Sequence, residues 1–208
     1  MLKSLTPLSI AAVLALGAPV WAQENSEAAV TEAPAAQEET TADSVLDLGE
    51  PVNAGPQLGE RYSKEKFGDW DLACVRTEAE NDPCSILQVL TDPNGSPMAE
   101  LTMFRLDQEG GQAVAAATVI VPLETHLPSA LSISVDGAPG KRYNYTFCNP
   151  VGCFAHIGLT SSDIDAFKKG NEAVLTLRPA PAPDQIVELK LSLKGFTAGY
   201  DVVDLVKQ

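Results

Sequence analysis

The sequence predicts an all-β fold, an antiparallel β-sandwich with one short helix, preceded by a disordered acidic spacer. Short segments that alternate apolar and polar residues recur through residues 64–208, with turn signals between them. Four cysteines form two pairs that are close in the sequence, and the chain opens with the pattern of an export signal. Together these observations predict a disulfide-bonded sandwich in an exported protein.

The first 22 residues have the three parts of a secretory signal peptide. Met1-Leu2-Lys3 is a short basic start, and residues 8–20 are mostly apolar. Val20-Trp21-Ala22 then precedes an abrupt polar stretch. The apolar run is shorter than the roughly 20 residues that a membrane-spanning helix needs. We therefore predict cleavage after Ala22, a mature chain with no integral membrane segment, and a periplasmic or extracellular location.

Residues 23–63 are predicted to form a disordered spacer rich in Ala, Pro and Glu. Residues 23–60 contain no aromatic side chain, Lys or Arg, so this stretch buries too little apolar surface to offset the entropy of ordering it. The formal net charge of the chain is −14, which repels the phosphates of nucleic acids and anionic lipids. Nucleic acid is therefore not an expected partner. Residues 64–208 have the usual size of one domain.

Nine strands are predicted in this domain, at residues 67–74, 84–91, 98–106, 112–121, 131–135, 141–148, 153–157, 172–178 and 185–193. The first alternates, with Trp70, Leu72 and Cys74 on one face. Asp92-Pro93-Asn94-Gly95 is a strong hairpin turn signal, because Asn-Gly tolerates positive φ angles. Residues 112–121 are continuously apolar.

One segment has the signals of a short helix instead. Thr160-Ser161-Ser162-Asp163 has the pattern of an N-terminal cap, and Gly170 follows two lysines as a C-terminal stop. Ile164 and Phe167 are three residues apart, so one apolar stripe can pack onto the sandwich.

The cysteines predict two disulfides. Four cysteines allow three pairings. The local pairing joins strand ends across short turns, Cys74 with Cys84 and Cys148 with Cys153. We predict this pairing, and we expect each bond to stabilise the domain by about 2–3 kcal/mol.

Two other roles of the cysteines agree less well with the sequence. Cys148, Cys153 and His156 include the residue types that bind zinc, but their spacing is not a familiar zinc pattern and export favours thiol oxidation. Catalytic dithiols are usually separated by two residues at a helix start, whereas four residues separate Cys148 and Cys153. We therefore expect neither a metal site nor a redox site.

Hydrolytic chemistry has few candidates in this chain. His126 and His156 are its only histidines, and it has no Gly-x-Ser-x-Gly motif. Asp69 and Asp71 flank Trp70 as a carbohydrate-processing pair would, but carboxylates two apart on an exposed strand face are usually only solvated. No set combines a nucleophile, a base and oxyanion donors, so we predict no catalytic residues, no enzymatic activity and no cofactor.

Several stretches together resemble the invasion-associated locus B family of exported bacterial proteins. The matching elements are 68–74, Cys84 with Gln88, 121–123, 131–137, 147–148, 151–155, the helix closing at Lys169-Gly170, and 191–198. The resemblance covers roughly residues 64–206, and its specificity lies in the order and spacing of the pieces. It implies an immunoglobulin-like sandwich in the envelope of an alphaproteobacterium and brings no catalytic motif. The chain departs from the family pattern at Glu124-Thr125-His126, where members often have a glycine.

The combined interpretation is a non-enzymatic exported envelope protein that acts as a binding or interaction module, with an envelope or host protein as its unidentified partner. One alternative is a secreted or surface adhesin or invasion factor that contacts a host protein. The other is a periplasmic hydrolase or redox enzyme.

Overall fold

The structure is a computed structural model that describes residues 47, 49, 55–107 and 111–207. The chain divides into two units, Met1–Gly49 and Glu50–Gln208, and the β fold belongs to the second. The predicted signal peptide, residues 1–22, lies outside the described residues, as does most of the predicted spacer, residues 23–63.

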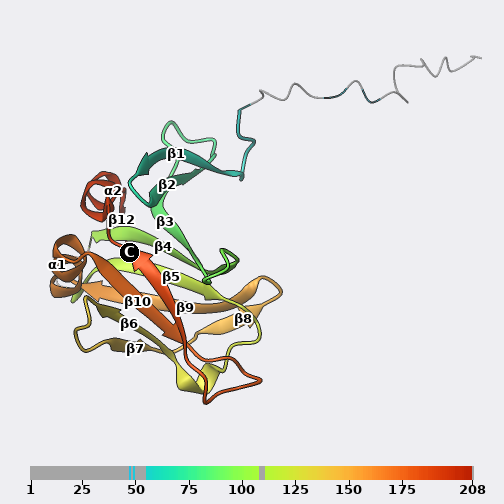
Figure 1. The fold of residues 1–208 in the computed structure, drawn as a ribbon. Helices are drawn as coiled ribbons and strands as arrows, with labels where there is room; N and C mark the ends of the chain where they lie inside the picture. The colour runs from blue at the N-terminus through green and yellow to red at the C-terminus, as the bar shows by residue number, and fades with distance from the viewer. Residues whose placement is uncertain (1–46, 48, 50–54, 108–110, 208) are drawn as a thin grey trace, which may run out of the picture. The chain divides into compact units, whose positions relative to one another are not determined.

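Twelve strands and two α-helices make up the described part of the second unit (Figure 1). In chain order they are β1 (Arg61–Phe67), β2 (Trp70–Val75), β3 (Cys84–Thr91), β4 (Pro97–Asp107), β5 (Ala113–Val121), the 3₁₀ turn η2 (Leu127–Ser129), β6 (Leu131–Val135), β7 (Lys141–Tyr143), β8 (Phe147–Asn149), β9 (Gly152–Thr160), α1 (Ser161–Lys169), β10 (Glu172–Leu177), β11 (Val187–Ser192), α2 (Phe196–Val202) and β12 (Leu205–Lys207). Neither helix has the length and hydropathy that a membrane-spanning segment needs.

The strands form two sheets. The large sheet has the order β1-β2-β3-β4-β5-β9-β8, and β12 pairs in parallel with the end of β4. The small sheet has the order β11-β10-β6-β7. Every other strand pair is antiparallel, so the predicted all-β antiparallel fold is confirmed.

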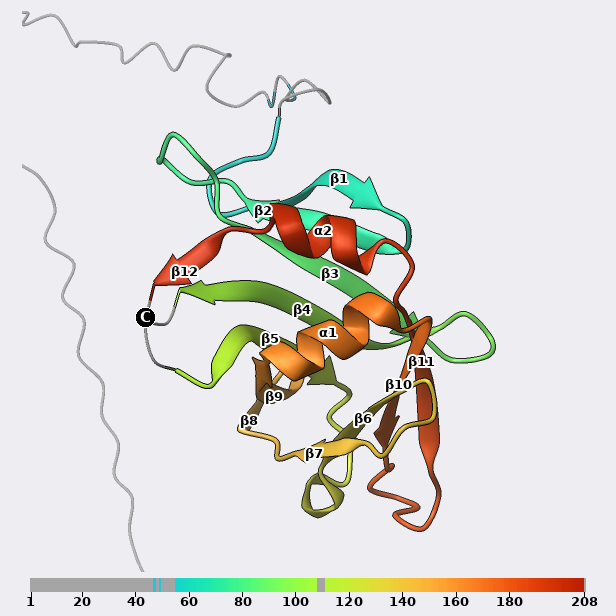
Figure 2. The same ribbon diagram turned by 90° about the vertical axis from the view of Figure 1, so that its left-hand side faces the viewer.

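Both sheets contribute to one hydrophobic core. Trp70 and Leu101 from the large sheet and Leu175 and Leu189 from the small sheet are almost fully buried in the same cluster. Complete burial of one such side chain contributes about 1.5–3 kcal/mol. In Figure 2, α1 and α2 lie in front of the large sheet and the small sheet lies beside them.

A buried polar network links the two sheets. Gln88 of β3 is only 8% exposed, and its side-chain Nε2 donates to the carbonyls of Asp69, at 3.2 Å, and Ser192, at 3.1 Å. Its Oε1 accepts from the backbone N–H of Ser192 at 2.8 Å. The indole Nε1 of Trp70 donates to the Ser192 carbonyl at 2.9 Å. Two side chains of the large sheet therefore satisfy the backbone at the end of β11, which would otherwise carry an unpaired buried group.

The turn between β1 and β2 fits against the same place. Gly68 has φ +60°, and a Cβ there would lie 2.5 Å from the Lys194 carbonyl oxygen. Gly195 has φ +88°, and a Cβ there would overlap the Phe67 carbonyl. The Asp69 N–H donates to the Lys194 carbonyl at 3.1 Å. Both positions need glycine because the two backbones touch.

The predicted helix is confirmed as α1, and its start has a simple chemical cause. The Thr160 side chain accepts from the Asp163 N–H, and the Asp163 carboxylate accepts from the Thr160 N–H, which is a capping box. Ile164 and Phe167 are buried on its inner face.

A second helix, α2, was not predicted. Phe196 and Tyr200 are four residues apart and both are buried, which is the helical spacing that the sequence offered. The Phe196 ring packs against Trp70, Phe167 and Tyr200 at centroid distances of 5.3, 5.4 and 5.5 Å. The end of the chain thus closes the core between α1 and β2.

Two predicted strands are each divided. Residues 67–74 break at Gly68-Asp69 into the end of β1 and β2. Residues 141–148 split into β7 of the small sheet and β8 of the large sheet. Alternation shows which side of a segment is buried, but it does not show that the chain passes from one sheet to the other midway. Tyr145 lies at this crossing, where burial raises the pKa of its phenol to about 12.

The folded unit also begins earlier than the predicted boundary at residue 64. Residues 61–63 pair with β2, and the N–H of Gly59 donates to the Arg76 carbonyl at 2.8 Å. The Arg61 guanidinium binds the Glu100 carboxylate through two hydrogen bonds, of 2.7 and 3.0 Å. This edge was missed because its sequence is polar and its burial is slight.

Replacing Gln88 tests the polar network. Gln88→Leu removes three hydrogen bonds to backbone groups of Asp69 and Ser192, and unpaired buried groups are costly. We expect a loss of about 2–3 kcal/mol in the free energy of unfolding, measured by urea denaturation. Thr118→Val, on the outer side of the large sheet, is the matched control and should change it by less than about 0.5 kcal/mol. Equal stability of the two variants would contradict the role given to Gln88.

Truncation tests the revised boundary. A chain that begins at Lys64 lacks Arg61 and Tyr62, which bind Glu100 and Asp82. We expect it to unfold at a lower urea concentration than a chain that begins at Gly55, because it also loses the pairing of residues 61–63 with β2. Identical urea midpoints would show that the polar start of β1 adds no stability.

Candidate functional site

The outer side of the large sheet carries several apolar side chains between β3 and β8. Val89, Glu100, Ile120, Phe154 and Phe147 are cross-strand neighbours in one row across β3, β4, β5, β9 and β8. Cross-strand neighbours point to the same side of a sheet. We call six apolar residues on this side the apolar face: Val89, Phe104, Ile120, Phe147, Val151 and Phe154.

Half of the apolar face is exposed, and two of its rings pack against each other. Val89 is 48% exposed, Phe147 45% and Val151 74%. The rings of Phe147 and Phe154 stack at 4.7 Å with an interplanar angle of 10°. Large exposed side chains held in a fixed arrangement are typical of a contact surface.

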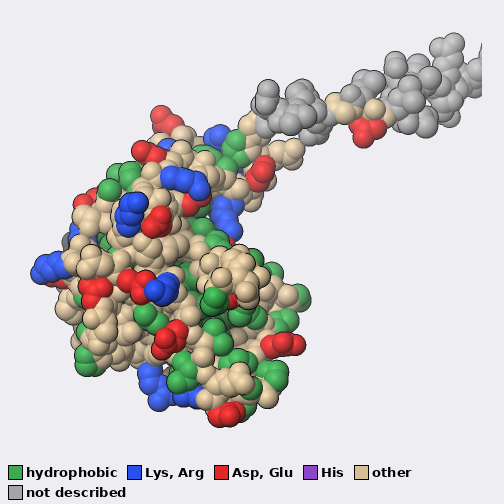
Figure 3. Space-filling model, in the orientation of Figure 1, with side chains coloured by type: hydrophobic (Ala, Val, Ile, Leu, Met, Phe, Trp, Pro, Cys, Tyr) green, Lys and Arg blue, Asp and Glu red, His purple; other side chains and the backbone are tan. Residues whose placement is uncertain are grey.

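Two shallow hollows lie on this side of the sheet. One, of about 450 Å³, is lined by Val89, Ile120 and Val151 with their neighbours. The other, of about 380 Å³, includes Phe104 and His156 in its lining. Figure 3 shows another side of the molecule, on which charged side chains of both signs are mixed with hydrophobic ones. The hollows give the apolar face a shape that partner side chains can enter.

The four cysteines form the two disulfides Cys74–Cys84 and Cys148–Cys153. Each bond joins directly opposite residues of neighbouring antiparallel strands, β2 with β3 and β8 with β9. The second bond closes the hairpin that presents Phe147 and Val151. It therefore holds one end of the apolar face.

His156 lies on the same side of the large sheet and does not join Cys148 and Cys153 in a metal-binding set, because both sulfurs are bonded to each other. Its ring packs edge-on against Phe147, with centroids 5.8 Å apart. Within residues 55–107 and 111–207, no group of three His, Cys, Asp or Glu residues is placed to hold a metal ion.

Asp69 and Asp71 bind different serines. Asp69 accepts from the Ser192 hydroxyl at 2.7 Å, at the junction of the two sheets. Asp71 accepts from the Ser63 hydroxyl, on the neighbouring strand β1. Each carboxylate thus binds its own serine, and the fold does not place the two carboxylates as a reacting pair.

His126 is half-buried in the turn before β6. Its Nδ1 lies 2.7 Å from the Ser129 hydroxyl, three residues further on. The Ser129 carbonyl in turn accepts from Arg142. No carboxylate among the described residues hydrogen-bonds to His126, so this serine and histidine lack the third group of a hydrolytic triad.

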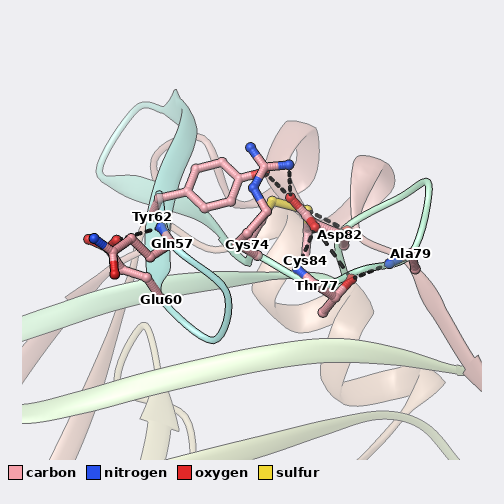
Figure 4. Close-up of polar contacts among 9 residues, drawn as sticks. Gln57, Glu60, Tyr62, Cys74, Thr77, Ala79, Asp82 and Cys84 are labelled. Atoms are coloured by element: carbon pink, nitrogen blue, oxygen red, sulfur yellow. Dashed lines mark hydrogen bonds and ion pairs between the residues drawn. A yellow bond between two sulfur atoms is a disulfide. The ribbon is translucent and has the colours of Figure 1, made fainter. Parts of the chain in front are cut away.

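A cluster of polar and charged contacts surrounds Asp82, next to the first disulfide (Figure 4). The Asp82 carboxylate accepts from the Thr77 N–H at 2.8 Å and from the Tyr62 hydroxyl at 2.7 Å, and Arg76 forms an ion pair with it at 3.0 Å. The Arg76 guanidinium also lies over the Tyr62 ring, 5.4 Å from its centroid. These groups neutralise one another, so the cluster serves to fix the loop between β2 and β3.

The hydrogen bonds around Asp82 make stability depend on pH. The Thr77 N–H, followed by the Tyr62 hydroxyl, lowers the pKa of Asp82 below its ordinary value of 3.8. A lowered pKa in the folded state gives stability that is present above the unfolded value and is lost as the pH falls through the folded value. We expect Asp82→Asn to be less stable than wild type at pH 7 and to lose less stability below about pH 4, in urea denaturation across pH 3–7.

Asp184→Asn, in the exposed loop after β10, is the control for this measurement and should follow the wild-type pH profile. An Asp82→Asn profile parallel to wild type at acid pH would rule out Asp82 as the source of the dependence.

The apolar face was not predicted from the sequence. A signal for it was present, because residues 112–121 are apolar on both sides of the strand. The pattern predicted a strand but did not show which of its sides stays uncovered, and the small sheet covers only one side of the large sheet.

Comparisons with known proteins agree with this fold. The family model described as "Invasion associated locus B (IalB) protein" matches residues 70–204. The invasion protein B homologs of Brucella abortus strain 2308 and of B. abortus biovar 1 strain 9-941 are each 26% identical over 143 residues, which is 69% of this chain and 80% of theirs.

The crystal structure of invasion associated protein B from Bartonella henselae has the same fold, with a TM-score of 0.53 and 20% identity. The match covers 65% of this chain and 91% of that one. The matched family model spans β2 to α2, including both disulfides and Trp70, Gln88 and Ser192, which join the sheets. The chain therefore belongs to the invasion-associated locus B family.

Proposed function

We propose that this protein is an exported, non-catalytic binding module of the bacterial envelope, and that its apolar face contacts a partner protein. The observation that carries the proposal is the row of Val89, Ile120, Phe154 and Phe147, in which Val89 and Phe147 are exposed and Ile120 and Phe154 are half-buried. Exposed apolar side chains gathered on one side of a sheet and bordered by charged residues are typical of protein contact sites.

Charge indicates the kind of partner. The chain has a formal net charge of −14, and Glu100 lies in the middle of the apolar row with its charge paired to Arg61. A protein that presents aliphatic or aromatic side chains within a basic surface is complementary to this face. A second copy of the same acidic chain is disfavoured by like-charge repulsion.

Export supports the envelope as the location. Residues 1–22 have the pattern of a signal peptide, and two disulfides are typical of proteins in oxidising compartments. The structural contacts of Asp69, Asp71, His126 and the cysteines support a non-catalytic role, since each of these groups is engaged by a local partner.

The names of the relatives favour a second candidate, in which the partner belongs to a host cell. The Brucella proteins are named as invasion protein B homologs, and the Bartonella protein as an invasion associated protein. The same apolar face would serve either partner, so the location of the cross-linked protein separates the two candidates.

Site-specific photocross-linking tests the proposed face. A photoreactive residue at position 89 or 147 should yield an adduct of one discrete mass in intact cells, alone or mixed with host cells. The same residue at position 188, on the outer side of the small sheet, is the matched control and should give at least about tenfold less adduct.

A second variant separates contact from folding. Ile120→Asp places a charge within the face and should reduce the position-147 adduct about tenfold, while the disulfides and the circular dichroism spectrum stay unchanged. Equal adduct yields from positions 147 and 188, or an adduct that survives Ile120→Asp in the folded protein, would contradict the proposal.

A further inference from the structure

A groove on the outer side of the small sheet is lined by basic and hydroxyl side chains. Its volume is about 510 Å³, and its lining includes Arg142, Arg178, Ser132, Ser134 and Thr176. No Asp or Glu lines it among the described residues, in a chain whose net charge is −14. The groove is therefore positively charged, whereas the molecule as a whole is negatively charged.

The sheet register brings these residues together. Thr176 of β10 lies opposite Ser132 of β6, and Ser132 lies opposite Arg142 of β7. Ser134 is the next residue of β6 on the same side. Arg178 directly follows β10, so the two arginines flank a row of hydroxyl groups.

Both guanidinium groups are held in place by neutral acceptors. Arg142 donates through Nη2 to the Ser129 carbonyl at 2.8 Å, and Arg178 donates through Nη1 to the Pro183 carbonyl at 2.8 Å. A carbonyl orients an arginine without neutralising it, and each guanidinium has further N–H donors. The ion pairs among the described residues use Arg61, Arg76, Lys141, Lys168 and Lys190, and neither arginine of the groove.

The hydroxyl groups in the groove are available as well. Ser132, Ser134 and Thr176 make no side-chain hydrogen bond to another described residue. The nearest charges on the neighbouring strand β11 are Glu188, opposite Thr176, and Lys190, which is paired with Glu172. Glu188 does not line the groove, so the groove has an acidic residue at one edge but none on its floor.

We propose that this groove binds the oxyanion group of a small organic molecule, with Arg142 and Arg178 as the charged donors and Ser132 and Thr176 as hydroxyl donors. The planar guanidinium matches two oxygens of a phosphate or carboxylate at once. The groove is larger than one phosphate ion and lies in the volume range of small-molecule sites, so the rest of the ligand can lie along the hydroxyl row.

Binding of defined probes to the chain that begins at Gln23 tests this site. Glycerol 3-phosphate and citrate separate a phosphate ligand from a carboxylate ligand, and glycerol with sodium chloride at equal ionic strength is the uncharged control. Amide shifts in two-dimensional nuclear magnetic resonance spectra should saturate for at least one anionic probe and should be largest in residues 129–134, 140–142 and 176–178.

Three variants decide whether the arginines carry the binding. Arg142→Gln and Arg178→Gln should each raise the dissociation constant of the preferred probe about tenfold, because each removes charge-assisted hydrogen bonds. Lys190→Gln, on the same outer side, should leave it within about twofold. Unchanged thermal unfolding of all three shows that the fold is kept.

Three results would overturn the proposal: shifts no larger than those with sodium chloride, full affinity in both arginine variants, or an equal loss in Lys190→Gln. Because the groove and the apolar face lie on different sheets, loss of probe binding does not predict loss of the photocross-linked adduct. Each of the two proposals can therefore fail while the other stands.

Discussion

The peptide group of Ser192 is held by two side chains from the opposite sheet, Gln88 and Trp70, and the arrangement of the sandwich depends on this contact. The small sheet buries apolar side chains against the large one, but hydrophobic contact alone does not fix how far one sheet slides over the other. Hydrogen bonds to a buried backbone group do, because a small displacement would leave that group unpaired. The contact of Gly68 and Gly195 beside it directs the chain from β11 into α2, which closes the core with Phe196.

The two outer sides of the sandwich differ in chemistry because the two sheets differ in sequence. Both sides of β4 and β5 carry apolar residues, whereas β6 and β10 place serine and threonine outward. Val89 and Phe147 therefore form a surface suited to another protein, and Arg142 and Arg178 form a groove suited to an anion. A single molecule could hold a protein on one sheet and a small ligand on the other without competition between them.

The local elements of this fold were largely predictable. Residues 84–91 and 131–135 are strands with the bounds that alternation predicts, and Thr160 with Asp163 starts α1 as the capping pattern indicates. What depends on partners distant in sequence was not predictable: β1 is polar, and the passage from β7 to β8 leaves no mark in the alternation of residues 141–148. The same limit applies to the groove, because Arg142 and Arg178 belong to no motif and meet only through the pairing of β7, β6 and β10.

The cysteines pair in the order in which they occur, Cys74 with Cys84 and then Cys148 with Cys153. In a chain that crosses a membrane N-terminus first, Cys74 meets Cys84 before any later thiol emerges. Cys148 then meets Cys153 while Cys74 and Cys84 are already bonded. An oxidase that joins thiols as they appear would then form the native bonds directly, and no disulfide isomerase would be required. Biogenesis of the sandwich would depend on thiol oxidation and on the late arrival of β11 and α2, rather than on the correction of mispaired bonds.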